Sequence, residues 1–344
     1  MSFDLYYSLR LIDKTNIMKL FITSVCILML TAFSSFAQAS QMATLLHDGT
    51  ITNFSSGTAF ADAMEAAVDG DVISLSSGMF TAVDIKKNVT VRGAGMTVDG
   101  YNDNELPTIL SGNILISFPQ STSNKLTLEG LVFTGTIRIR NADNFTAYKC
   151  QFKNIHSESA TNSYSWKNFK FLHCIISEIS NDYITDSSLD FLNCVIGEKG
   201  DFDNSDCLKQ FTNCVLYIGA SIEQSNIINS IIIMQKGSAY RSSINSSCSV
   251  NHCIIAKCDQ YNAQNGGNRF LGDTEGIFAE SGFYKLTPMM LEFKGNDDTQ
   301  VGIHGGNMPF DPVTSRPRIT RFDVSSQTTA DGKLSIDIEI SNDK

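Results

Sequence analysis

Hydrophobic and polar positions repeat along residues 128–255 in units that mostly have a cysteine at their centre. "FLNCVIG" (191–197) is followed by "FTNCVLY" (211–217), and further copies lie on both sides at intervals of about 16 to 24 residues. We call the central residue of each copy the anchor. The anchors are Leu131, Cys150, Cys174, Cys194, Cys214, Ser230 and Cys253. Repeats of this length indicate a solenoid, because one unit cannot bury its apolar face alone.

Each copy also has apolar residues three positions before the anchor and two positions after it, as Phe191 and Ile196 do around Cys194. A strand buries alternate residues, so the anchor and the residue two after it share a face, but the residue three before is out of phase. The backbone must therefore turn just before the anchor. The residues expected at these bends are Gly130, Lys149, His173, Asn193, Asn213, Asn229 and His252. Apart from the lysine, these types favour the left-handed conformation that a sharp bend requires.

The pattern predicts an all-β solenoid in which each coil contains a strand, a bend and a second strand. Two N-terminal stretches, "GTAFADAMEAAVDGDVISLSSGMF" (57–80) and "IKKNVTVRGAG" (85–95), resemble the opening of the right-handed parallel β-helix family of pectate-lyase type. "FYKLTPMMLEFKGNDDTQVGIHGG" (283–306) resembles the closing segment of many secreted β-helix proteins of Bacteroidetes-type bacteria. The resemblance covers residues 43–306. It implies a short N-terminal capping helix and about eight or nine coils.

Three segments are expected along the chain. Residues 1–39 read as an upstream extension and a signal peptide, because "MKLFITSVCILMLTAFSSFAQAS" (18–40) has a lysine, an apolar run and small residues at Ala37 and Ala39. Residues 40–308 form the β-helix. Residues 309–344 form a proline-containing linker and a C-terminal β-hairpin around an Asp-Gly turn. We expect a secreted protein, or one on the outer surface of a Gram-negative bacterium, with no transmembrane helix in the mature chain.

Charge and cysteine content limit the kinds of partner and metal site that the chain is expected to have. The formal net charge is −10, and no basic stripe is present, so nucleic acid is not an expected partner. The chain has no Cys-x-x-Cys pair of the kind that zinc sites use. The anchor cysteines are expected to be free thiols stacked inside the solenoid, whereas the pairing of Cys207, Cys248 and Cys258 is left open.

Outward residues of one rung suggest a ligand site. "TIRIRN" (136–141) alternates, which places Arg138 and Arg140 on the outer face, where their forked donors could hold a uronate or a sulfate. Solvated surface charge is the alternative. Tyr164 and Trp166 lie on the following loop, where they could stack on a sugar ring or seal the edge of the stack.

"DFDNSD" (201–206) contains Asp201, Asp203 and Asp206, which could supply part of a calcium shell. Calcium is the one cofactor that the sequence suggests, and solvated turn residues are the alternative. The arginines and these aspartates should lie about three coils apart, roughly 14 Å, which is too far for one lyase site. His47, His156 and His304 have no catalytic partner that the sequence identifies.

No catalytic motif emerges, so the favoured function is a non-catalytic glycan-binding or adhesin-like module whose partner is a polysaccharide or surface glycan. The alternative is a polysaccharide lyase or glycoside hydrolase acting on an acidic polysaccharide through a site built from loops. A structural spacer is the third hypothesis.

Overall fold

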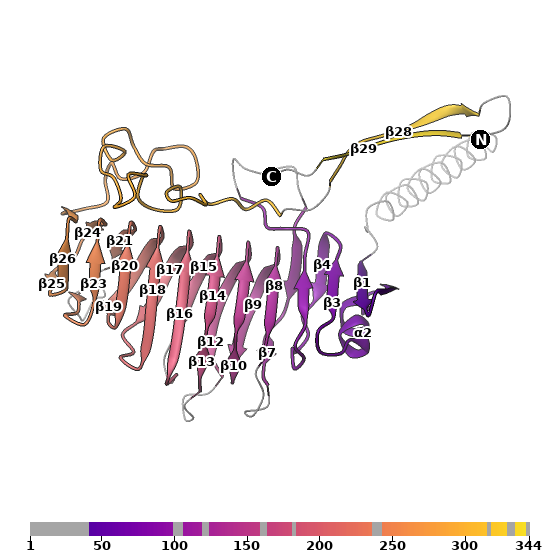
Figure 1. Ribbon diagram of the computed structural model, residues 1–344, viewed down its shortest axis with the longest axis horizontal. Helices are drawn as coiled ribbons and strands as arrows, with labels where there is room; N and C mark the ends of the chain where they lie inside the picture. The colour runs from indigo at the N-terminus through magenta and orange to yellow at the C-terminus, as the bar shows by residue number, and fades with distance from the viewer. Residues whose placement is uncertain are drawn as a thin grey trace, which may run out of the picture. The chain divides into compact units, whose positions relative to one another are not determined.

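The computed structural model describes residues 41–98, 106–118, 124–158, 164–180, 184–235, 243–314, 318–328 and 334–341. Within these ranges the chain forms a parallel β-solenoid of about eight turns, with one short helix, α2 (Ala59–Ala66), near its N-terminal end (Figure 1). The predicted all-β solenoid and its short N-terminal helix are confirmed. Right-handedness stays a prediction, and the predicted signal peptide lies outside the described residues.

Two long sheets, called here A and B, run the length of the solenoid and are joined at the bends. In spatial order, sheet A contains β2 (Thr50–Ser55), β1 (Met42–His47), β3 (Val72–Leu75), β5 (Thr90–Arg92), β8 (Leu126–Glu129), β11 (Phe145–Tyr148), β14 (Phe169–Leu172), β16 (Ser187–Leu192), β18 (Cys207–Thr212), β20 (Ser225–Ile228), β23 (Ser249–Asn251) and β26 (Gln264–Gly266).

Sheet B contains β4 (Gly78–Thr81), β6 (Thr108–Ser111), β7 (Ile114–Ile116), β9 (Val132–Ile139), β12 (Gln151–Ser157), β15 (Ile175–Ser180), β17 (Val195–Phe202), β19 (Val215–Ile222), β21 (Ile231–Met234), β22 (Ser243–Ile244), β24 (Ile254–Ala256), β25 (Gln260–Tyr261) and β27 (Arg269–Leu271). Short strands β10 (Ala142–Asp143) and β13 (Trp166–Lys167) pair separately. The predicted C-terminal strands are present as the antiparallel pair β28 (Arg318–Thr328) and β29 (Leu334–Ser341).

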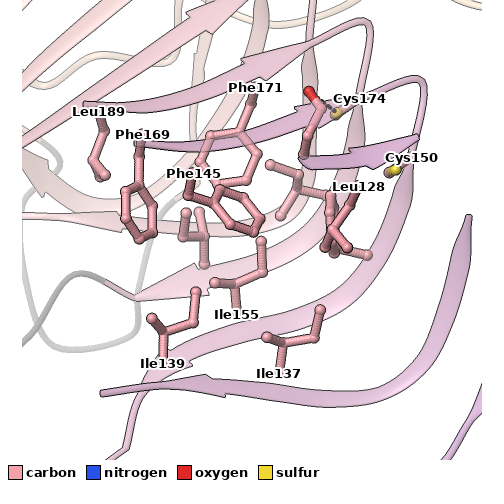
Figure 2. Close-up of a cluster of buried hydrophobic side chains, with 14 of the residues drawn as sticks. Leu128, Ile137, Ile139, Phe145, Cys150, Ile155, Phe169, Phe171, Cys174 and Leu189 are labelled. Carbon is pink, nitrogen blue, oxygen red and sulfur yellow. Dashed lines mark hydrogen bonds between the residues drawn. The ribbon is translucent and has the colours of Figure 1, made fainter. Parts of the chain in front are cut away.

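The predicted bends are confirmed. Every residue expected at a bend has φ between +48° and +62°, including Lys149. Every anchor is fully buried, and the apolar residues three before and two after the anchors are buried as well. Figure 2 shows Cys150 and Cys174 side by side at the corner, with Phe145, Phe171 and Ile155 pointing into the interior.

The anchor side chains also form hydrogen bonds, which the sequence did not suggest. The Cys194 thiol donates to the carbonyl of Leu192, two residues earlier, at 3.3 Å, and the Ser230 hydroxyl donates to Ile228 at 2.8 Å. The anchor of one coil accepts the backbone N–H of the previous one, as Cys194 Sγ does from Cys174 at 3.4 Å. A small side chain with both a donor and an acceptor is therefore favoured at this position, which explains why serine replaces cysteine once.

An antiparallel hairpin that the sequence analysis missed precedes the first coil. Strands β1 and β2 pair through an Asp48-Gly49 turn, in which both residues have positive φ (44° and 78°). Asp-Gly is a strong sequence signal for such a two-residue turn. Helix α2 buries Phe60 and Met64 and packs on the first strands, as its predicted capping role requires.

We expect the anchor cysteines to be unreactive in the folded protein. Burial raises the pKa of Cys214 and Cys253 to about 12 and holds that of Cys150 and Cys194 well above the usual thiol value, and the thiolate is the reactive form. In a labelling experiment read by mass spectrometry, partly exposed Cys258 should react first. The anchors should react only after denaturation, and rapid labelling of any of them in native protein would contradict the register.

Candidate functional site

Arg138 lies on the outward face of β9, as the sequence predicts, and Arg140 directly follows that strand, but Arg140 is already paired. Ile137 and Ile139 are buried, whereas Arg138 is exposed. Arg140 donates from Nη2 and Nε to Glu158 at 2.7 and 3.2 Å, which raises the pKa of Arg140 and lowers that of Glu158. Its charge is therefore balanced within the protein, and Arg138 is the arginine that remains exposed for a ligand.

Polar side chains continue across the neighbouring strands. His156 of β12 pairs in register with Arg138 of β9. His156 Nε2 lies 3.9 Å from Glu178 Oε1 on β15. This row brings a guanidinium, an imidazole and a carboxylate onto one outward face. It also gives His156 the acidic neighbour that the sequence could not identify.

The aromatic pair Tyr164 and Trp166, for which the sequence left two roles open, lies in the core. Trp166 is 0% exposed, and its ring stacks on Phe169 at a centroid distance of 5.2 Å. Tyr164 is 7% exposed, and its hydroxyl donates to Glu158 at 3.1 Å. The indole offers no face to a ligand in this arrangement, so the structural role considered for these residues, sealing the edge of the stack, is the one that the burial supports.

The aspartate-rich turn is organised by a buried lysine. Lys209 on β18 points inward and is 0% exposed, and its amine donates to the carbonyls of Phe202 and Asn204 at 3.1 and 2.6 Å. Asp203 and Asp206 are exposed, and the Asp201 side chain lies outside the described part of the chain. Among the described residues, no group of three or more His, Cys, Asp or Glu side chains is arranged to hold a metal ion. Carbonyls that could have joined a calcium shell bind the lysine instead.

His47 also has a carboxylate partner. Its Nδ1 lies 2.8 Å from Asp71 Oδ1, and the hydrogen bond raises the pKa of His47. The second oxygen of Asp71 accepts from the backbone N–H of Val68. The pair links the hairpin to the loop that enters β3, and it lies far along the chain from Arg138 and Arg140.

One corner of the solenoid is covered by residues 272–314, which follow β27. We call this segment the strap. In Figure 1 it leaves the final coils and runs back along the upper ends of the strands towards the N-terminal coils. It packs on outward residues that directly follow the anchors. Together they form an apolar cluster separate from the solenoid interior. It includes Val195, Val215, Ile231 and Ile254 from sheet B and Ile277, Met290, Val301, Ile303 and Phe310 from the strap.

Side chains at the bends bind the strap. Because the strap runs back along the solenoid, the bends of later coils bind earlier strap residues. Asn229 exchanges two hydrogen bonds with Asn296, each 2.9 Å long. Asn193 Nδ2 donates to the carbonyls of Ile303 and Gly305 at 2.8 and 3.0 Å. Gly306 lies so close to the Asn213 amide that a Cβ there would approach within 2.2 Å. The bend residues therefore have two functions, the left-handed turn and the binding of the strap.

The strap continues into the stretch that the sequence suggested as a linker. The backbone N–H of Asp311 donates to His173 Nδ1 at 3.2 Å, and Lys149 Nζ donates to Asp311 at 2.8 Å and to the carbonyl of Val313. Thr314 is 4% exposed and donates to the carbonyl of Ala94 at 3.0 Å. These hydrogen bonds to the strap explain why a lysine stands at this bend, where the other bends have glycine, asparagine or histidine.

We expect His173 to make stability depend on pH. Burial, together with the nearby Lys149 ammonium, lowers the pKa of His173 to about 4, while Asp311 opposes this shift. Because the folded protein holds the imidazole neutral, its contribution is complete above pH 6.5 and is lost as the pH falls towards 4. The free energy of unfolding should drop by about 3 kcal/mol over that window in denaturant titrations. His173→Asn introduces the residue that other bends have, and the drop in the free energy of unfolding between pH 6.5 and 4 should then disappear. An unchanged pH dependence of stability in this variant would show that His173 is not its cause.

A groove of about 630 Å³ opens beside the strap, on the outward side of β19, β21 and β24. Its lining residues are Tyr217, Ile233, Met234, Gln235, Lys257, Gly272, Thr274 and Phe278. Tyr284 meets the rings of Tyr217 and Phe278 edge to face at centroid distances of 6.4 and 5.1 Å. Burial raises the pKa of Tyr217, so its hydroxyl stays protonated at neutral pH. A second groove of about 500 Å³ around Lys167, Asp186 and Asp206 has no aromatic ring in its lining.

The groove was not predicted from the sequence, because its walls come from three coils and from the strap. Its aromatic rings are separated by 61 positions between Tyr217 and Phe278. No family model and no curated protein matches the chain. The parallel β-solenoid is therefore the level at which the resemblance is supported. Within the described residues, no helix has the length and apolar character needed to span a membrane.

Proposed function

We propose that the protein is a secreted or cell-surface β-solenoid that binds glycan without cleaving it. The observation that carries the proposal is the groove beside the strap, which combines two aromatic rings with the Gln235 amide, the Thr274 hydroxyl and Lys257. Sugars have apolar C–H faces that pack on aromatic rings and hydroxyls that bond to polar groups, and sites of this size are typical for small ligands. The fold itself is consistent with carbohydrate-related proteins.

Two further observations support the proposal. The signal-peptide layout of residues 18–40 favours export to a compartment where the ligand would be an extracellular glycan. Directly after β9 and β12, Arg140 and Glu158 bond to each other, and this pairing occupies a base and an acid that a lyase or hydrolase could use. Arg138 is the exposed base on which the catalytic alternative depends.

The test is a panel of acidic and neutral polysaccharides, read both for retention of the protein and for new unsaturated or reducing ends. We expect retention without new ends. Phe278→Ala should weaken binding about tenfold by removing a ring face. Gln235→Ala should also weaken binding, with an unchanged thermal midpoint, because the amide lies at the surface of the groove.

Gln210→Ala is the matched control, because Gln210 is exposed on β18 and lies outside the groove. It should bind as the parent protein does. Cleavage of any polymer that disappears in Arg138→Ala would overturn the proposal in favour of a lyase or hydrolase. Binding that is equal in all the groove variants would show that the glycan site lies elsewhere.

A further inference from the structure

The hairpin strand β2 forms an open edge at the N-terminal end of sheet A. It pairs with β1 on one side and is the last strand of its sheet. Its sequence, TITNFS, contains no charge and no proline, and five of its six residues are exposed. Natural proteins usually blunt such edges with lysine, proline or bulges, because an open edge pairs with other strands.

The turn geometry determines which backbone groups the edge presents. A two-residue turn makes His47 and Thr50 a hydrogen-bonded pair, and hydrogen-bonded pairs then alternate along the hairpin. Ile51, Asn53 and Ser55 therefore direct their N–H and C=O groups away from β1. The free edge offers three evenly spaced donor and acceptor pairs.

The outer face of the same hairpin carries exposed apolar side chains. Ile51 is 64% exposed, and Leu46, its partner in the β1–β2 register, is 41% exposed. Met42 is 44% exposed and lies opposite Ser55. Apolar residues thus flank the edge at both ends of β2.

The other ends of sheets A and B are less suited to pairing. Strands β26 and β27, at the C-terminal end, have three residues each; Gly266 ends β26 and Arg269 begins β27. At the N-terminal end of sheet B, the Gln41 amide donates to the carbonyl of Met79 on β4. A six-residue uncharged edge is matched in length and character by a second copy of itself.

We propose that two copies of the chain associate through β2, in antiparallel pairing across a two-fold axis that passes between the two Asn53 residues. This register pairs Asn53 with Asn53 of the other copy, and Ile51 with Ser55, so that every backbone group on both edges finds a partner. Ile51 of each copy then lies two strands away from Met42 of the other copy, with the small Ser55 between them. The exposed apolar side chains of the two hairpins thus lie on the same face of the joined sheet.

The first test measures molecular mass by light scattering over a range of concentrations, using residues 41–344, which form one compact unit. The protein should be a dimer that dissociates on dilution. Ile51→Lys should give a monomer with an unchanged thermal midpoint, because a lysine on each edge opposes pairing. Ile51→Thr, which keeps a β-branched residue without the charge, should remain dimeric.

The second test fixes the register. In a Cys258→Ser background, Asn53→Cys should form an intermolecular disulfide under mild oxidation, because residues paired on the axis lie about 5.5 Å apart between Cα atoms. Thr52→Cys, one position away, should crosslink more slowly. A monomer at every concentration, a dimer that persists in Ile51→Lys, or equal crosslinking at positions 52 and 53 would overturn the proposal. A full-length chain that stays monomeric while residues 41–344 dimerise would overturn it as well.

Discussion

Ile303→Asp is expected to lower the free energy of unfolding by roughly 3 to 5 kcal/mol, because it buries an unpaired carboxylate. Ile303 is 1% exposed and lies in the apolar cluster between the strap and sheet B. Its carbonyl also accepts the Asn193 amide, so a displaced strap would leave that bend unsatisfied. Urea titrations followed by circular dichroism measure the loss.

Met308→Asp is the matched control, because Met308 lies on the same strap and is 51% exposed. It introduces the same charge where water can solvate it, so the change should stay within about 0.5 kcal/mol. Equal losses for the two variants would mean that the strap does not bury Ile303. A small effect for both would mean that the strap contributes little to stability.

Lys209→Ala is expected to cost roughly 3 to 5 kcal/mol of stability. The substitution opens a cavity in the solenoid interior and leaves the carbonyls of Phe202 and Asn204 without their donor. The turn that holds Asp203 and Asp206 should become a site of proteolysis in the native protein, since the lysine is its internal tie. Thermal denaturation and limited proteolysis together measure the effect.

Two comparisons separate the causes. Lys209→Met keeps most of the side-chain volume, so the difference between the methionine and alanine variants isolates packing from the lost hydrogen bonds. Leu208→Ala removes an apolar side chain that is 50% exposed on the same strand, and it should be nearly neutral. A Lys209→Ala protein as stable as the parent, with an intact turn, would contradict the role given to the lysine.

The coil interior could be predicted from sequence because it depends on local rules. Alternation in a strand and the phase break before Cys194 are enough to require a bend, and the positive φ of Asn193 confirms it. The same alternation in "CLKQF" (207–211) puts Lys209 on the inward face with Phe211, where both are buried. A lysine on an apolar face indicates a buried polar partner, here the carbonyls of Phe202 and Asn204.

The strap could also have been anticipated. Residues directly after the anchors, such as Val195, Val215 and Ile231, point outward and yet are apolar. A strand that is apolar on both faces is covered on both faces. What covers it could not be read from the sequence, because the partners lie far away in the chain, as Lys149 and Asp311 do.

The binding site was the least predictable part. The sequence left two roles open for Trp166, stacking on a sugar ring or sealing the edge of the stack, and Trp166 stacks on Phe169 in the core. The groove residues carry no local pattern, since Gln235 and Phe278 meet only when the strap folds back. Short-range periodicity gives no information about such contacts.

The strap has a consequence for how this protein can change in evolution. Solenoids commonly grow or shrink by whole repeats, since each repeat contacts only its neighbours. Here Asn229, Asn193, His173 and Lys149 meet successive points on one continuous segment. Inserting one coil would move all the bends on one side of the insertion by about 4.8 Å relative to that segment. The length of the strap therefore has to match the number of coils, and the number of coils can change only if the strap changes in length as well.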